Sequence, residues 1–300
     1  MPDILVIGSL NVDLVVRAAR FPQPGETISG DDLQTLPGGK GANQAMAAAR
    51  LGASVSMLGR VGKDNFGGSL LDNLQSNSVD TKLVQRDDAS TGTAIIIVDS
   101  NGQNSIVLSA GANGNVSDAD VKTVAFSDFN LLLLQLEIPI ETVLSAARRA
   151  KESGLRVLLN PAPARALPDE LISLPDFLVP NETELSLLTN QPVHDISSAE
   201  KAARILFDRG AQTVIVTLGA NGALLVTKVI VKHIPPFKVN VVDTTAAGDA
   251  FIGGFASGLL QNKSLEESVR YGCACGALAT TKFGAQPSLP TKEEVARFIT

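Results

Sequence analysis

Short runs of apolar residues alternate with helical repeats over most of the chain. The runs contain almost no polar position, as expected of strands covered on both faces: Ile4–Ile7, Val55–Leu58, Leu131–Leu134, Val157–Leu159, Phe177–Val179 and Val214–Val216. Between them apolar residues recur every three or four positions, as at Ile140, Val143, Leu144 and Ala147, before a glycine. The alternation predicts an α/β fold with a doubly wound, mainly parallel sheet flanked by helices.

Two regions interrupt the alternation. Residues 12–37 have strand and turn signals without a helical repeat, and residues 91–111 contain two apolar runs around an Asn101-Gly102 turn typical of a hairpin. The regions could be two unrelated surface hairpins, or they could pair into one small sheet beside the strand ends where ligands bind. We expect the second arrangement. It gives a β lid of residues 12–37 and 91–111 over a domain of residues 1–11, 38–90 and 112–300.

The composition is that of a globular protein. Hydrophobic residues make up 44% of the 300 residues, and a formal net charge of −6 argues against a nucleic-acid partner. The N-terminus lacks a basic segment and no apolar run approaches the length of a membrane span, so we expect no membrane association and a cytoplasmic location. Cys273 and Cys275 are too few for a disulfide framework or a zinc site, and they are expected to be small buried thiols.

The strongest chemical signal lies in residues 242–251, Val-Asp-Thr-Thr-Ala-Ala-Gly-Asp-Ala-Phe. A strand-like run, Val239–Val242, leads into this segment and an apolar helical repeat follows it. Small side chains from Ala246 to Gly248 would leave the backbone N–H groups of a helix start open to an anion. A carboxylate repels a phosphate and is therefore a poor group for binding one. Asp249 is instead suited to act as a general base for an attacking hydroxyl. Alternatively, Asp249 only complements the helix dipole.

A glycine-rich loop precedes an alanine-rich helix at residues 37–44, Pro-Gly-Gly-Lys-Gly-Ala-Asn-Gln. Its glycines would let the backbone approach a polar ligand, although a tight strand-to-helix turn has the same composition. The spacing is not that of a Walker A loop. No Gly-x-Gly-x-x-Gly follows the first strand, which disfavours a nicotinamide-dependent oxidoreductase.

Polar residues follow several predicted strands, where a doubly wound sheet gathers them in one crevice. Each could instead be a turn or cap residue, and for Asn181 an N-cap is the default interpretation. The positions are Asn11, Asp13, Glu137, Asn181, Glu184 and the segment from Thr217 to Gly222.

Taken in order, these motifs resemble the ribokinase/PfkB family of carbohydrate kinases from Ile4 to about Pro290. The resemblance rests on seven segments: Gly8–Asp13, Gly38–Gln44, Asn160–Ala164, Asn181–Glu184, Thr217–Gly219, Asp243–Phe251 and Gly284–Ser288. It implies an ATP-dependent kinase with the doubly wound domain and β lid described above, and a homodimer formed through the lid. The Gly38–Gln44 loop and the Gly284–Ser288 tail favour members that convert D-ribose to ribose 5-phosphate by phosphorylating O5.

The resemblance also implies site residues. The sugar would be held by Asn11, Asp13, Gly39, Lys40, Gly41, Asn43, Glu137 and Asp249. Asp249 would act as the base, while the backbone N–H groups of Ala246, Ala247 and Gly248 hold the transferred phosphoryl group. ATP would lie along Asn181, Thr217, Leu218, Gly219, Ala220, Asn221, Gly222 and Gly248. Glu184 would organise Mg²⁺ through water, and K⁺ would be ligated by Asp243, Thr245, Ala279, Lys282, Gly284 and Ser288, several of them through backbone carbonyls.

Other functions stay open at this point. A deoxyribose kinase, or a nucleoside or hexose kinase of the same family, would use the same machinery. A catalytically silent sugar sensor is disfavoured because the segment from Ala246 to Asp249 is intact. Cys273 and Cys275 fall in a region expected near the adenine, which leaves the adenine contacts undefined.

Overall fold

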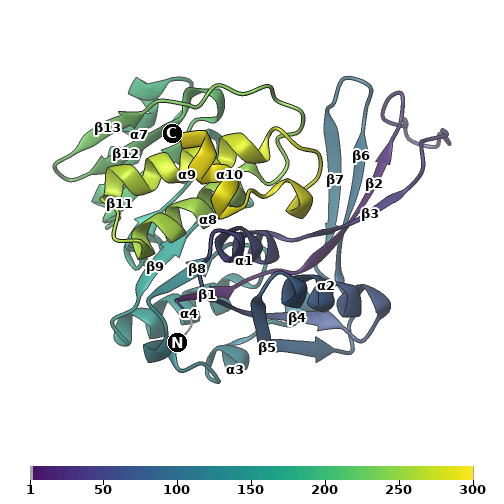
Figure 1. Cartoon of the computed structure of the whole chain (residues 1–300), viewed down its shortest axis with the longest axis horizontal. Coiled ribbons are helices and arrows are strands. Elements are labelled where there is room, and N and C mark those ends of the chain that lie inside the picture. Colours follow the sequence, from purple (N-terminus) through teal and green to yellow (C-terminus); the bar gives the residue numbers. More distant parts are fainter. Residues whose placement is uncertain (1–2, 300) are drawn as a thin grey trace.

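The computed structural model describes residues 3–299. Within them a nine-stranded sheet has the order β13-β12-β11-β10-β9-β8-β1-β4-β5 (Figure 1). Its strands are β1 (Ile4–Ile7), β4 (Val55–Gly62), β5 (Val79–Asp87), β8 (Leu131–Leu134), β9 (Arg156–Leu159), β10 (Phe177–Leu178), β11 (Thr213–Thr217), β12 (Ala223–Thr227) and β13 (Val231–Ile234). All neighbours are parallel except β11–β12 and β12–β13, so the predicted fold class is confirmed.

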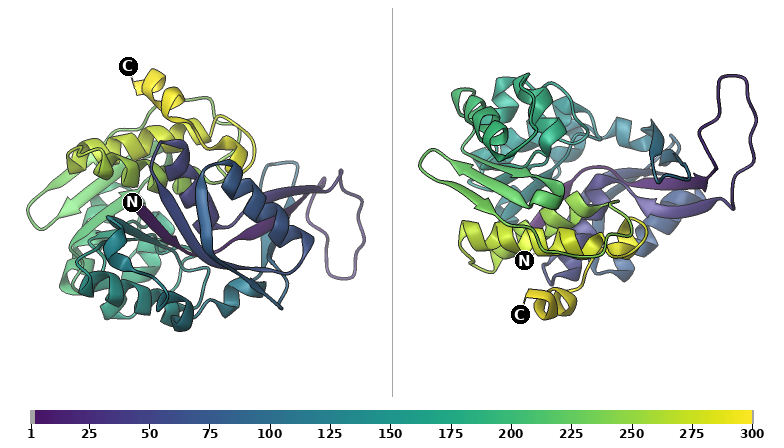
Figure 2. Two further views of the ribbon diagram at one scale, coloured as in Figure 1. Left: turned by 60° about the horizontal axis from the view of Figure 1, so that its bottom comes forward. Right: turned by 90° about the horizontal axis from the view of Figure 1, so that it is seen from above.

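The sheet lies between two helical layers, as Figure 2 shows. One layer has α1 (Lys40–Arg50), α2 (Asn65–Ser76), α8 (Ala247–Leu260), α9 (Leu265–Ala279) and α10 (Lys292–Ile299). The other has α3 (Asp118–Val121), α4 (Ile140–Glu152), α5 (Asp169–Ser173), α6 (Glu182–Thr189) and α7 (Ile196–Asp208). Successive side chains of a strand point to opposite faces, so Ile4 and Val6 enter the first core while Leu5 and Ile7 enter the second. This two-sided burial explains why the strand sequences are apolar throughout.

One predicted strand is wrong. Residues Val239–Val242 form no strand, and Val241 and Val242 are 63% and 64% exposed. The backbone N–H groups of Val242 and Asp243 instead donate to the carbonyl of Thr280, just beyond α9. The segment is therefore held by a loop at a helix end, and its apolar residues do not enter the core.

A second sheet forms the lid, with the order β3-β2-β6-β7. Its strands are β2 (Asn11–Arg17), β3 (Gln34–Gly38), β6 (Gly92–Val98) and β7 (Asn104–Ser109). The two helix-free segments do pair, because β2 runs parallel to β6 from Asn11 opposite Gly92 to Arg17 opposite Val98. Figure 1 shows this sheet projecting from one side of the main domain. Every residue of β7 is exposed, including Ile106, Val107 and Leu108.

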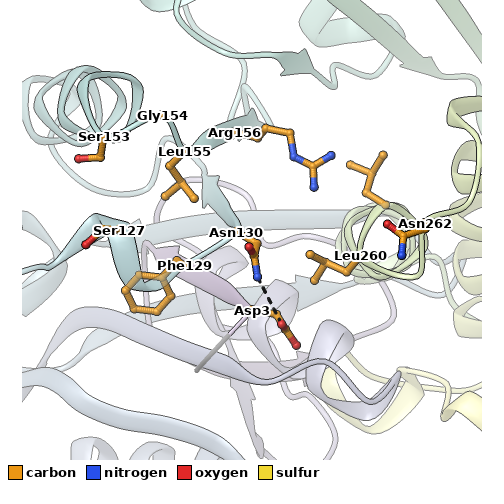
Figure 3. A pocket seen from close by; sticks show the side chains of 11 residues that line it. Asp3, Ser127, Phe129, Asn130, Ser153, Gly154, Leu155, Arg156, Leu260 and Asn262 are labelled. Carbon is orange, nitrogen blue, oxygen red and sulfur yellow. Dashed lines mark hydrogen bonds between the residues drawn. The ribbon is translucent and has the colours of Figure 1, made fainter.

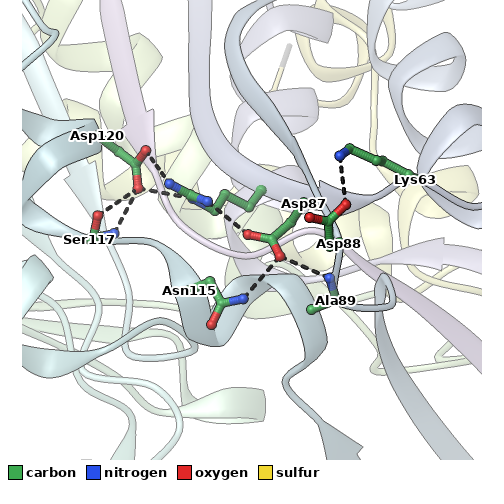
Figure 4. Close-up of polar contacts among 8 residues, drawn as sticks. Lys63, Asp87, Asp88, Ala89, Asn115, Ser117 and Asp120 are labelled. Carbon is green, nitrogen blue, oxygen red and sulfur yellow. Dashed lines mark hydrogen bonds and ion pairs between the residues drawn. The ribbon is translucent and has the colours of Figure 1, made fainter.

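The junction between domain and lid is held by a partly buried ion-pair cluster (Figure 4). Arg60 on β4 donates through Nη1 to Asp87 at 2.7 Å and through Nε and Nη2 to Asp120 at 3.0 and 2.8 Å. Asp87 ends β5, just before the chain enters the lid, and its carboxylate also accepts from Ala89 N and Asn115 Nδ2. These donors lower the pKa of Asp87 to about 2. The cluster joins the chain on both sides of the second lid segment.

In the described part of the chain, no helix has the length and apolar character needed to span a bilayer.

Candidate active site

Part of the predicted site lies together at the carboxyl ends of the central strands. A cavity of about 210 Å³ opens there, where doubly wound sheets bind ligands. Of the predicted residues, those that line it are Lys40, Asn181, Glu184, Thr217, Ala246, Gly248 and Asp249. Asn160, named in the sequence only as part of a motif, lines it as well.

Asp249 lies in the first turn of α8 and is 6% exposed. Its carboxylate accepts two hydrogen bonds from the start of α1, from Asn43 Nδ2 and Gln44 Nε2, each at 2.9 Å. Burial raises the pKa of Asp249, while the charge of Lys40 and the two amide donors oppose the rise. A buried carboxylate with a raised pKa is suited to accept a proton from a hydroxyl.

The sequence assigned no role to Gln44. It is fully buried on an otherwise alanine-rich face of α1, and its Oε1 accepts from Gln135 Nε2 at 2.7 Å. Gln135 follows β8, and a Cβ built on Gly8 would overlap its Oε1. A buried polar residue among alanines was the available signal, but the sequence does not identify the partner.

The start of α8 presents backbone donors to the cavity. Ala246 caps the helix with φ +57°, a left-handed conformation that costs a non-glycine residue roughly 1–2 kcal/mol. The Ala247 N–H already donates to the Thr244 carbonyl at 3.2 Å. Helix geometry leaves the N–H groups of Gly248 and Asp249 without intrahelical partners. Because a Cβ on Gly248 would meet nothing within 4 Å, the approach to these donors is open.

A second group of carboxylates lies where the lid joins the domain. Glu137 accepts from Ser9 Oγ at 2.5 Å and from Lys40 N at 3.0 Å. Burial, with Glu137 and Asp249 nearby, raises the pKa of Asp13 to about 7, and Lys40 opposes this rise. Burial disfavours the Lys40 ammonium, but the surrounding carboxylates raise its pKa overall. The carboxylates of Asp13 and Glu137 can accept hydrogen bonds from the hydroxyl groups of a ligand, and they lie around the Lys40 ammonium.

On the other side of the cavity, Asn181 and Glu184 form a reciprocal capping box on α6. Asn181 Oδ1 accepts from Glu184 N, and Glu184 Oε2 accepts from Asn181 N, both at 2.8 Å. The N-cap interpretation of Asn181 is therefore confirmed, although both residues also line the cavity. Thr217 lies beside them, since its N–H donates to the Pro180 carbonyl. The turn Gly219–Asn221 follows at the surface.

Three of the six residues predicted to hold K⁺ (Asp243, Thr245, Ala279, Lys282, Gly284 and Ser288) contact one another. Asp243 accepts from Thr245 N and Oγ1 at 2.9 and 2.6 Å and from Gly284 N at 2.9 Å. Burial raises the pKa of Asp243, but these hydrogen bonds outweigh it and lower the pKa, so the carboxylate is charged. Lys282 Nζ pairs with Glu294, which leaves its carbonyl as the only ligand it could offer a cation. A charged carboxylate is the kind of oxygen ligand that a hard cation prefers.

A divalent metal would have few protein ligands at this site. Residues 3–299 contain no cluster of three or more His, Cys, Asp or Glu side chains that could hold a metal ion. Glu184 is one of two buried carboxylates that line the cavity, and the other is Asp249. This fits Mg²⁺, which proteins usually bind through one or two carboxylates together with substrate phosphates.

A larger cavity of about 630 Å³ lies at the opposite edge of the sheet (Figure 3). It is lined by Asp3, Asn130, Arg156 and Leu260 among others, next to the amino ends of β1, β8 and β9. It contains none of the predicted site residues. Ligands of doubly wound sheets bind at the carboxyl ends of the strands, so the smaller cavity is the candidate active site.

The two cysteines are structural, as predicted. Both are free and buried on α9, and burial raises the pKa of Cys273 to about 12 and also raises that of Cys275. A Cβ on Gly254 of α8 would lie 2.7 Å from Cys275 Sγ, so the thiol fills the contact between the two helices.

Comparison with known proteins identifies this arrangement. The profile described as "pfkB family carbohydrate kinase" matches residues 1–292. The chain belongs to the pfkB family of carbohydrate kinases. It is 45% identical over 301 residues to a ribokinase of Haemophilus influenzae, covering 99% of this chain and 98% of that protein. A deoxyribokinase of Salmonella typhi is 42% identical over 301 residues, with the same coverage.

A solved structure of Arabidopsis thaliana ribokinase, complexed with ribose and ATP, matches with a TM-score of 0.91 at 36% identity, covering 100% of this chain and 99% of that one. The predicted family, fold and enzyme class are thus confirmed for this pfkB-family kinase. Its relatives include a ribokinase and a deoxyribokinase at similar identity, so the comparison alone does not choose the acceptor.

Proposed function

We propose that this pfkB-family kinase transfers the γ-phosphoryl group of ATP to O5 of D-ribose, giving ribose 5-phosphate. The observation that carries the proposal is the buried Asp249 carboxylate, held by two amides beside the open N-terminus of α8. A proton acceptor and backbone N–H groups that can bind an anion lie together at one helix start. The similarity to ribokinases supports ribose as the acceptor.

In this proposal Asp249 accepts the proton of the attacking hydroxyl as its oxygen approaches phosphorus. The N–H groups at the start of α8, with the positive end of the helix dipole, stabilise charge on the transferred group. Asn11, Asp13, Lys40, Asn43 and Glu137 hold the sugar, and Asn181, Thr217 and the turn after β11 hold the nucleotide. Glu184 would hold Mg²⁺ through water, and the bound ion would neutralise phosphate charge.

Substitution of Asp249 by Asn tests the base. The amide is nearly isosteric but cannot accept the proton, so kcat should fall by ~10²–10⁴ while sugar affinity largely survives. Steady-state kinetics and calorimetric sugar binding measure the two effects. The matched control is Asp169→Asn, which removes a first-turn carboxylate from α5 that does not line the cavity. Turnover close to wild type in Asp249→Asn would exclude the base role.

The acceptor is tested by comparing D-ribose with 2-deoxy-D-ribose. We propose that Asp13 accepts the 2-hydroxyl, so kcat/KM should favour ribose by at least about tenfold. The pKa of Asp13 is raised to about 7, and its ionised form, the better acceptor, dominates above that pH. The preference should therefore grow from pH 6 to pH 8, and Asp13→Asn should remove this pH dependence. Equal or better use of deoxyribose would favour the alternative, a deoxyribose kinase.

We also infer activation by K⁺, based on the charged Asp243 carboxylate, which lies shortly before the helix start that contains Asp249. A cation there would stabilise the loop that leads into α8. Replacing K⁺ by an equal concentration of tetramethylammonium should lower turnover severalfold at saturating Mg²⁺-ATP and sugar, and adding K⁺ should restore it. The same rate with Na⁺ as the only monovalent cation would contradict selective activation.

The exposed apolar face of the lid supports a homodimer. Ile95 and Val107 are 49% and 65% exposed and lie directly opposite each other on adjacent strands, so they share one face of the lid, and a second copy is the proposed cover. Light scattering should give twice the chain mass of 31.3 kDa. Val107→Glu should shift the protein toward the monomer, whereas Lys82→Glu, at an exposed position of β5, should not. A monomeric wild type at micromolar concentration would rule out the dimer.

A further inference from the structure

The side-chain amide of Asn113 binds the backbone between β1 and β2, where the chain passes from the main sheet into the lid. Asn113 belongs to the short turn Gly111–Asn115, which follows β7, and it is 1% exposed. Its Oδ1 accepts from Leu10 N at 2.9 Å, and its Nδ2 donates to Leu10 O at 3.0 Å. The side chain thus satisfies both backbone groups of Leu10, as a neighbouring strand would.

The same amide fixes the next residue. Asn113 Nδ2 also donates to Asn11 Oδ1 at 2.7 Å. Because the Asn11 oxygen accepts this bond, its Nδ2 must point the other way, and it lies 3.5 Å from Glu137 Oε2. Asn11 is 3% exposed, so its amide orientation is set by these neighbours and not by water.

The lid leaves space for this amide pair. Gly92, the first residue of β6, is the parallel-strand partner of Asn11. A Cβ built on Gly92 would overlap both Asn113 Nδ2 and Asn11 Oδ1. Glycine at this position is therefore required by the contact between the two asparagines.

From this geometry we infer that Asn113 is a positioning residue for the acceptor sugar. It holds the Asn11 amide so that its N–H group faces the sugar side of the site beside Glu137. The inference rests on the proposed function, in which Asn11 binds the sugar. Asn113 makes these contacts from the turn Gly111–Asn115, by which the chain leaves the lid, so this turn would act on the sugar through Asn11.

Asn113→Asp is the sharpest test. A carboxylate offers no donor to Leu10 O or Asn11 Oδ1, so the Asn11 amide should turn over and place its oxygen beside Glu137. We expect the KM for ribose to rise about tenfold or more, with the KM for ATP within about twofold of wild type. Asn115→Ala is the matched control, since Asn115 lies in the same turn but binds Asp87. It should leave both KM values unchanged.

A double-mutant cycle separates positioning from a general structural role. With Asn11→Ala in place, adding Asn113→Asp should cause little further rise in the KM for ribose. Full additivity of the two effects would overturn the inference. If Asn113→Asp does not fold, Gly92→Ala keeps both amides but forces them apart, and it should raise the KM for ribose alone.

The cycle also distinguishes the inference from the function on which it rests. If Asn11→Ala raises the KM for ribose but neither Asn113→Asp nor Gly92→Ala does, the positioning role fails and the sugar-binding role of Asn11 stands. If Asn11→Ala leaves the KM for ribose unchanged, both fail.

Discussion

The structure depends on keeping one carboxylate ionisable inside the protein. Burying Asp249 carries a desolvation cost of several kcal/mol, which only nearby donors and charge can offset. Two amides from α1 and the Lys40 ammonium supply them. Gln44 is in turn oriented by Gln135, whose oxygen occupies the space left by Gly8. A residue at the end of the first strand is thus constrained by a group more than 200 positions away.

Small residues make these contacts possible. For Asn43 and Gln44 to reach Asp249, α1 and α8 must approach closely. A Cβ on Gly253 of α8 would overlap the Ala47 side chain of α1, so the helices meet at their smallest residues. The alanine stripe of α1 therefore has a role beyond helix propensity, because bulkier residues would separate Asp249 from its hydrogen-bond donors.

The sequence predicted those features that depend on local pattern. The all-apolar strands followed from two-sided burial, and the lid followed from two segments without helical repeats. Val239–Val242 was wrongly predicted as a strand because an exposed apolar loop can have the same residue composition as a strand. The segment is held by the Thr280 carbonyl at the end of α9. Gln44 and Asn113 were missed for another reason. Their partners lie 205 and 103 positions away along the chain. The local sequence around a polar residue in a helix or a turn does not indicate such a distant partner.

The topology of the lid also orders its assembly. Its central pairing joins Asn11 to Gly92, which are 81 positions apart (92 minus 11), and β4, α2 and β5 lie between them. Closing so long a loop is entropically costly until the intervening elements have packed. The lid neighbours of Asn11 and Asp13 are therefore in place only when this long loop has closed.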